Sequence, residues 1–229
     1  MLIEDRIVDF YRRVIFGEKY DVSLTTNPDE VFKWCFYNAW SDMARHTLKW
    51  NDGSADKDEI KQDICKDFVN DLTNKNWISF TTQDIRDFIS EFQTKMKNLG
   101  HFKYTDGGIQ KNFTFGQAQK VVNMFFKYLY TFKDELNLQG CTVFEKCDCP
   151  IDSRNFQRIG QDSKEFCKGQ PKIVRNKRYI VNPKNSKEDI TWSVLDDKDQ
   201  YEVIQDRIDS IITNSGKYQN RLDYEFDWK

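Results

Sequence analysis

The sequence contains no uninterrupted apolar run of about 18 residues, the length that a membrane-spanning helix needs. Its first residues, Met1–Arg6, lack both the basic start and the apolar core of a secretory signal. We therefore expect a cytoplasmic protein that has no membrane partner. Its 229 residues, 38% hydrophobic and 15% aromatic, are enough to bury one substantial core.

Motifs of several enzyme classes are also missing. A glycine-rich phosphate loop, a dinucleotide fingerprint and a Gly-x-Ser-x-Gly elbow are absent, which disfavours nucleotide hydrolysis and serine-esterase chemistry. The only two histidines, His46 and His101, are not at metal-ligand spacing, and the cysteine pattern Cys-x5-Cys-x-Cys-x17-Cys over 141–167 fits neither zinc nor iron–sulfur sites. We expect free thiols, no metal and no cofactor.

The net charge of the chain is small, but positive charge is concentrated in its middle. The net charge is −2, yet residues 95–187 hold 18 Lys or Arg against 8 Asp or Glu. A basic middle between acidic flanks is typical of proteins that contact a phosphate backbone. A solvated surface whose charges balance across the fold is the alternative.

Apolar residues recur at three- and four-residue steps along most of the chain, which predicts amphipathic helices. A Thr-x-x-Gln capping box at Thr114 and Gln117 marks one helix start. We expect a mostly α-helical, two-lobed single domain with a central cleft and at most a small β-hairpin. Its parts are N-terminal helices (1–100), a catalytic helix and Pro-Ile-Asp segment (101–160), and a basic loop and C-terminal helix (161–229). The expected helices are 3–16, 28–50, 57–73, 83–98, 114–131, a short one near 153–159, and 197–213; the expected hairpin flanks 175–178.

Lys120 and Asp152 are the candidate catalytic residues. Lys120 lies in the second turn of the helix that Thr114 begins, and Asp152 follows Pro150, whose ring fixes the backbone just before it. An amine and a carboxylate that meet in a dry cleft can attack a sugar carbon and stabilise the charge that results. A solvated Lys120, with Asp152 as a cap of the next helix, is the structural alternative.

The stretch 114–158 resembles the helix–hairpin–helix DNA glycosylase superfamily, most closely its archaeal 8-oxoguanine glycosylase branch. The resemblance rests on the apolar helix that Lys120 begins, read as Lys-Val-Val-Asn-Met-Phe-Phe-Lys-Tyr, and on Pro150-Ile151-Asp152-Ser153-Arg154 at a comparable distance. The Gly-x-Gly hairpin of that superfamily is reduced here to the single Gly116.

The resemblance implies that Lys120 attacks the deoxyribose C1′ and forms a Schiff base, after which the strand could be nicked by elimination. Attack needs a neutral amine, which burial beside Val121 and Phe125 would favour. Asp152 would stabilise charge at the sugar or relay a proton. The expected function is a DNA glycosylase, with AP-lyase activity as an option, that acts on double-stranded DNA with a flipped base, either oxidised guanine or a modified base of foreign DNA in antiviral defence.

Further residues are expected to contact the DNA. A capped helix start can hold a phosphate through free backbone N–H groups, and the basic segment 154–187 suits backbone contacts. Large aromatic side chains, among them Trp192, are candidates for base stacking. The expected DNA-binding residues are Gly116, Gln117, Arg154, Arg158, Lys172, Arg175, Lys177 and Arg178, and the expected base pocket consists of Trp34, Trp40, Asn123 and Lys127.

Two other functions fit the same sequence. A helical module that binds nucleic acid without catalysis would use residues 95–187. A protein-interaction module would use the acidic flanks and aromatic helices, and it would show no salt-dependent affinity for DNA. We expect a monomer in each case.

Overall fold

The structure is a computed structural model, and it describes most of the chain from residue 27 onward. The expected helix 3–16 falls almost wholly outside the described residues. Those residues are 10, 12–13, 27–45, 47–51, 56–102, 104–106, 109–168, 173–174, 179–180, 192–195 and 198–227.

The described chain is mostly helical, which confirms the mostly α-helical part of the expected fold class. Helix 28–50 was predicted too long, because the chain leaves the helix after Ala44, and helix 153–159 too short, because it continues to Phe166. Helices α6 and α9 were not predicted. The helices are α2 (Pro28–Ala44), α3 (Lys57–Thr73), α4 (Thr82–Leu99), α5 (Phe115–Tyr130), α6 (Val143–Lys146), α7 (Ser153–Phe166), α8 (Lys198–Ser215) and α9 (Arg221–Phe226).

Local signals in the sequence explain where the helices begin. The Asn27 side chain accepts from the N–H of Asp29 ahead of α2, and Thr81 and Thr114 form complete capping boxes before α4 and α5. Helix α4 ends at Gly100, whose φ of 74° lies in the left-handed region that favours glycine.

Two short antiparallel hairpins accompany the helices. Strands β3 (Ile173–Val174) and β4 (Tyr179–Ile180) pair where the hairpin was expected. Strands β1 (Tyr104–Asp106) and β2 (Ile109–Lys111) pair between the expected helices 83–98 and 114–131, where no hairpin was expected. The described residues thus hold one more hairpin than the sequence predicted.

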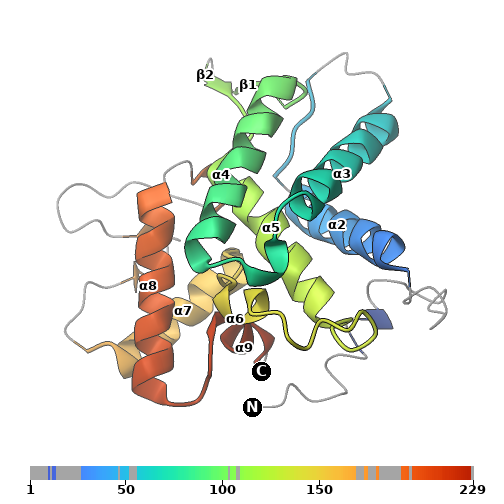
Figure 1. The fold of residues 1–229 in the computed structure, drawn as a ribbon. Coiled ribbons are helices and arrows are strands. Elements are labelled where there is room, and N and C mark those ends of the chain that lie inside the picture. Colours follow the sequence, from blue (N-terminus) through green and yellow to red (C-terminus); the bar gives the residue numbers. More distant parts are fainter. Residues whose placement is uncertain are drawn as a thin grey trace.

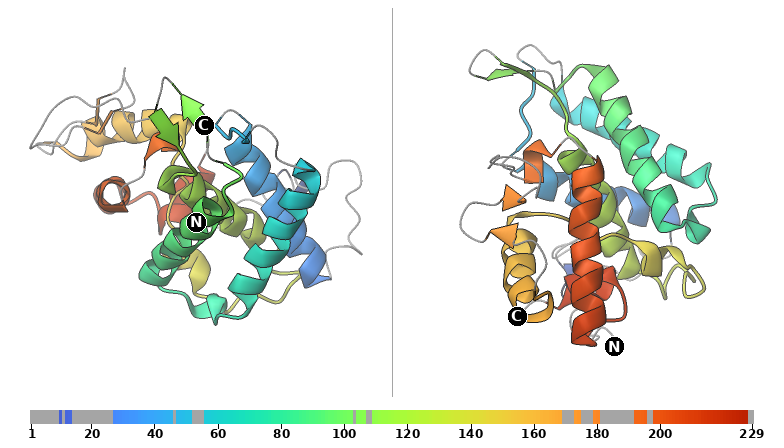
Figure 2. Two further views of the ribbon diagram at one scale, coloured as in Figure 1. Left: turned by 90° about the horizontal axis from the view of Figure 1, so that it is seen from above. Right: turned by 90° about the vertical axis from the view of Figure 1, so that its left-hand side faces the viewer.

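Helix α5 runs through the middle of the molecule (Figures 1 and 2). Helices α2, α3 and α4 lie on one side of it, and α7, α8 and α9 lie on the other. The α2–α4 side is joined to α5 by an aromatic core in which the Phe68 ring lies 5.0 Å from those of Phe36 and Phe125 and 5.3 Å from those of Phe88 and Phe92. No helix in the described ranges is both long enough and apolar enough to span a bilayer.

Candidate lysine–aspartate site

Helix α5 is buried along nearly its whole length, including its polar side. Every residue from Phe115 to Leu129 is buried. The polar side carries Gln119, Lys120, Asn123 and Lys127, and it packs against the segment that leads into α7 and against α8 and α9. Lys120 is only 8% exposed, so the alternative of a solvated lysine is wrong.

The structure brings Lys120 and Asp152 together. The Lys120 Nζ lies 3.2 Å from Asp152 Oδ2, and the two side chains are 9% and 20% exposed. The indole ring of Trp192 covers the amine, with its centroid 4.7 Å from Nζ. The site therefore comprises an amine, a carboxylate and an aromatic ring, from three parts of the chain.

Asp152 has two structural roles at once. Its Oδ1 accepts hydrogen bonds from the backbone N–H groups of Arg154 and Asn155, each at 2.9 Å, and so caps α7. Its Oδ2 faces Lys120. The cap was the structural alternative to a catalytic aspartate, and the geometry shows that capping leaves the second oxygen for the amine.

Two buried glutamines hold the segment that carries Asp152. Gln119 donates to the carbonyl oxygen of Ile151 at 2.8 Å and accepts from the Ile151 N–H at 3.1 Å. Gln205, on α8, makes the same pair of bonds to Cys149, at 2.8 and 3.1 Å. Sequence reasoning missed both glutamines, because a polar residue on an amphipathic helix reads as solvent-facing unless its partner is known.

The start of α5 is closed by the turn that carries Trp192. The Gly116 N–H donates to Leu195 O at 2.6 Å, and the Thr114 hydroxyl donates to Ser193 O at 2.7 Å. A side chain at position 116 would clash with the Trp192 carbonyl oxygen, so only glycine permits this approach. The expectation that Gly116 offers a free N–H to a phosphate is corrected accordingly.

Gln117, the other residue expected at the helix start, is also occupied. It is 5% exposed, its N–H bonds to the Thr114 hydroxyl, and its side chain donates to Thr47 O at 3.0 Å. It therefore joins α5 to the end of α2 rather than presenting an N–H group at the surface.

The four residues expected to form a base pocket do not share one. Trp40 belongs to the aromatic core, with its ring nearly parallel to that of Phe113 at 6.2 Å, whereas Trp34 is 37% exposed on α2. Asn123 is fully buried and donates to the Tyr201 hydroxyl at 2.8 Å. The expected grouping is therefore corrected.

Lys127, the fourth expected pocket residue, forms a second buried ion pair. Its Nζ lies 2.6 Å from Glu225 Oε1 on α9, and both side chains are 2% exposed. The other Glu225 oxygen accepts from Asn155 at 2.7 Å and from the Cys149 thiol at 3.3 Å. Burial, followed by the charge of Glu225, raises the pKa of the Cys149 thiol well above its ordinary value, so this thiol stays protonated and serves as a donor.

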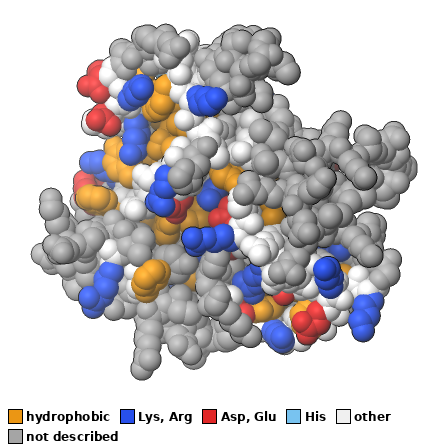
Figure 3. Space-filling model, turned by 180° about the vertical axis from the view of Figure 1, so that it is seen from behind, with side chains coloured by type: hydrophobic (Ala, Val, Ile, Leu, Met, Phe, Trp, Pro, Cys, Tyr) orange, Lys and Arg blue, Asp and Glu red, His pale blue; other side chains and the backbone are white. Residues whose placement is uncertain are grey.

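The expected DNA-binding arginines differ in their surroundings. Arg154 is exposed, whereas the Arg158 guanidinium lies 3.9 Å from the Tyr224 ring centroid and donates to Tyr224 O and Tyr218 Oη. Arg158 therefore anchors α9. Lys172, Arg175, Lys177 and Arg178 lie outside the described residues. On the face drawn in Figure 3, basic side chains of the described residues are spread out rather than gathered in one patch.

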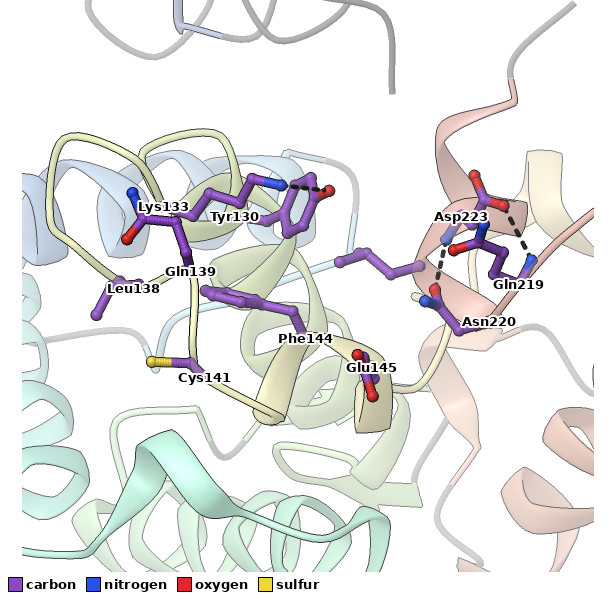
Figure 4. A pocket seen from close by; sticks show the side chains of 11 residues that line it. Tyr130, Lys133, Leu138, Gln139, Cys141, Phe144, Glu145, Gln219, Asn220 and Asp223 are labelled. Carbon is purple, nitrogen blue, oxygen red and sulfur yellow. Dashed lines mark hydrogen bonds between the residues drawn. The ribbon is translucent and has the colours of Figure 1, made fainter. Parts of the chain in front are cut away.

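Two pockets open beside α7 and α9, away from the lysine–aspartate pair. One, of about 370 Å³, runs along α7 from Arg154 to Phe166 and is closed by Lys217 and Tyr218. The other, of about 170 Å³, lies between Phe144 and the start of α9 (Figure 4). Neither is lined by Lys120 or Asp152.

The cysteines and acidic residues offer no evident metal site. All six cysteines are free thiols, and the part of the chain that the structure describes holds no cluster of three or more His, Cys, Asp or Glu able to bind a metal.

A buried carboxylate beside the site ties two helices together. Asp148 is fully buried and pairs with Arg86 of α4 at 2.9 Å and with Arg221 of α9. Burial opposes the charge on Arg221, but hydrogen bonds to Asp209 and the charge of Asp148 outweigh it and raise the arginine pKa. The pKa of Arg86 is raised as well, so both guanidinium groups remain charged, and Asp148 is the buried carboxylate that they share.

Asp148→Ala is expected to lower the free energy of unfolding by about 3–5 kcal/mol, because two buried guanidinium groups lose their shared partner. Urea denaturation of the variant and the wild type measures this. Asp209→Ala is the matched control: it removes a partner of the same Arg221, but one that is 48% exposed, and should cost about 1 kcal/mol or less. Equal losses in the two variants would contradict the role given to Asp148.

Comparison of the chain with protein-family models, with curated proteins and with solved structures found no match.

Proposed function

We propose that the protein is a DNA glycosylase in which Lys120 is the nucleophile and Asp152 its acid–base partner. The observation that carries the proposal is the 3.2 Å contact between Lys120 Nζ and Asp152 Oδ2. The two residues are 32 positions apart in the sequence, and both side chains are mostly buried. Attack on an electrophilic carbon needs the neutral amine, and Asp152 Oδ2, at hydrogen-bond distance, is a base that can accept the proton of Lys120.

The reaction proceeds by displacement at the sugar. Lys120 gives up a proton, for which Asp152 Oδ2 is the hydrogen-bonded acceptor, and its nitrogen then bonds to C1′ of the deoxyribose. The glycosidic C1′–N bond breaks, and the base leaves with the electron pair and takes up the proton that Asp152 accepted, which restores the carboxylate. Ring opening of the sugar gives a Schiff base, from which β-elimination nicks the strand or water releases the enzyme.

Asp152 also stabilises the transition state. A carboxylate close to C1′ lowers the energy of the positive charge that develops as the base departs, and its orientation is fixed by the cap it forms on α7. A preorganised charge of this kind needs no rearrangement during the reaction. The double role of Asp152 thus supports catalysis rather than competing with it.

The substrate is double-stranded DNA with one nucleotide rotated out of the stack, because Lys120 cannot reach a C1′ within a duplex. Exposed Arg154, two residues after Asp152, is placed to contact the phosphate backbone, and Lys172, Arg175, Lys177 and Arg178 extend the same basic segment in sequence. Oxidised guanine, or a modified base of foreign DNA, is the class of base that we propose. The enzyme acts as a cytoplasmic monomer.

Borohydride trapping tests the proposal. The wild-type protein is incubated with a panel of duplexes that each carry one oxidised or otherwise modified base, and sodium borohydride is added to reduce any Schiff base. We expect a covalent protein–DNA adduct, together with release of the free base, for at least one duplex. Salt-dependent DNA binding without base release or adduct would favour the non-catalytic module instead.

A further inference from the structure

The segment that presents Asp152 belongs to no helix or strand that could pair its backbone groups. Residues 147–152 form no regular structure, yet Cys147 through Ile151 are buried. Buried N–H and C=O groups need partners. Amide side chains supply them, since Gln205 pairs with both polar groups of Cys149 and Gln119 with both polar groups of Ile151.

Gln119 is the more fully engaged of the two. Besides its two bonds to Ile151, its Nε2 donates to Gly116 O at 3.0 Å, and its Oε1 accepts from Asn123 at 3.2 Å. All four hydrogen-bonding positions of the amide are therefore used, and the side chain is 0% exposed. Such an amide has one orientation, so it fixes the position of the backbone that it binds.

The location of Gln119 relates the two reacting groups. It directly precedes Lys120 on α5, and Ile151 directly precedes Asp152. The paired bonds between Gln119 and Ile151 are thus a short link between the backbone that carries the amine and the backbone that carries the carboxylate.

We propose that Gln119 is a positioning residue that sets the distance between Lys120 and Asp152. The inference rests on the proposed function, because it assigns Gln119 a purpose in the same reaction. Gln119 touches neither the substrate nor the reacting atoms. It acts through Ile151.

Gln205 provides a matched control within the same segment. It is also 0% exposed, and its bonds to Cys149 have the same lengths, 3.1 and 2.8 Å, as those of Gln119 to Ile151. Cys149 is three residues before Asp152, whereas Ile151 is adjacent. Gln119→Ala and Gln205→Ala therefore each remove one pair of bonds to this segment, at different distances from the carboxylate, and Gln119→Ala also removes the bonds to Gly116 and Asn123.

The kinetic test compares the two variants under single-turnover conditions at saturating DNA. Gln119→Ala is expected to reduce the rate of adduct formation about 100-fold, as a displacement of about 1 Å can, while DNA affinity stays close to that of the wild type. Gln205→Ala should reduce the rate far less, and urea denaturation measures the stability that each variant loses. Equal rate losses that track stability would reduce Gln119 to a structural residue and overturn the inference.

Gln119→Glu adds a pH profile that a merely structural role would not produce. A protonated glutamic acid can donate to Ile151 O, whereas its carboxylate repels that oxygen. The rate of the variant relative to the wild type should therefore rise as pH falls through the pKa of the new carboxyl group.

Nearby groups do not mimic this response. Of the groups that face the amide, Asn123 does not titrate, and burial raises the pKa of the Tyr201 hydroxyl well above its ordinary value. A ratio that is constant with pH would contradict the inference.

Carbodiimide coupling tests the inference without an activity assay. This reagent joins amines and carboxylates that are in contact, and peptide mass spectrometry then identifies the Lys120–Asp152 product. The Lys120–Asp152 product should be formed in the wild type and in Gln205→Ala, and lost in Gln119→Ala. The partly exposed Lys95–Asp71 pair, at 2.8 Å, should couple in all three proteins. Retention of the Lys120 product in Gln119→Ala would overturn the positioning role, whereas absence of base release by the wild type would refute only the proposed function.

Discussion

Lys120→Gln is expected to abolish the covalent DNA adduct, because glutamine cannot form an imine with a sugar. The substitution keeps a polar side chain of similar length beside Asp152 and under the Trp192 ring, so the fold should be preserved. Borohydride trapping followed by denaturing electrophoresis measures the loss, and circular dichroism confirms that the variant is folded.

Lys133→Gln is the control for this experiment. Lys133 also lies over an aromatic ring, with its Nζ 4.4 Å from the Tyr130 centroid and 3.0 Å from the Tyr130 hydroxyl, but it has no part in the proposed site. Its replacement should leave trapping unchanged. An adduct that persists in Lys120→Gln, or one lost in Lys133→Gln, would show that another amine is the nucleophile.

Asp152→Asn should reduce the single-turnover rate of base release by about 10²–10⁴-fold, the range for loss of an acid–base group. Asparagine caps a helix about as well as aspartate, so the hydrogen bonds to Arg154 and Asn155 are retained. Loss of the charged bond to Lys120 should cost about 1–2 kcal/mol of stability, which leaves the protein folded. The rate, the DNA affinity and the urea midpoint are measured together.

Asp56→Asn separates the cap from the catalysis. Asp56 caps α3 with the same pair of bonds, to the N–H groups of Asp58 at 2.9 Å and Glu59 at 3.3 Å, but within the described part of the chain it forms no ion pair with a lysine. This variant should keep full activity. If Asp152→Asn were as active as Asp56→Asn, the carboxylate at 152 would be a cap and nothing more.

The helices were predicted from the sequence better than any other part of the fold. Caps are local, so Thr81 and Thr114 mark the starts of α4 and α5 without knowledge of the rest of the fold. Helix α9 was missed because its six residues are fixed by distant partners, above all Arg158, which stacks on Tyr224 and bonds to its carbonyl oxygen. Such a segment carries little periodicity of its own.

The candidate site was predictable only in part. Lys120 and Asp152 were identified from their local sequence, and the structure brings them together. The expected base pocket was wrong because Asn123 and Lys127, although they share a helix side with Lys120, turn to Tyr201 and Glu225 instead. The helical repeat shows which residues share a side of the helix, but it does not show which segments of the chain pack against that side.

Gly116 has a consequence for finding relatives of this chain. In a relative with alanine at the equivalent position, the segment that carries Trp192 could not lie so close to the start of α5. The tryptophan ring would then no longer cover the lysine. Glycine four positions ahead of the lysine is therefore a marker of this particular enclosure. Together with an aspartate 32 positions after the lysine, it gives a pattern by which distant sequences can be sorted.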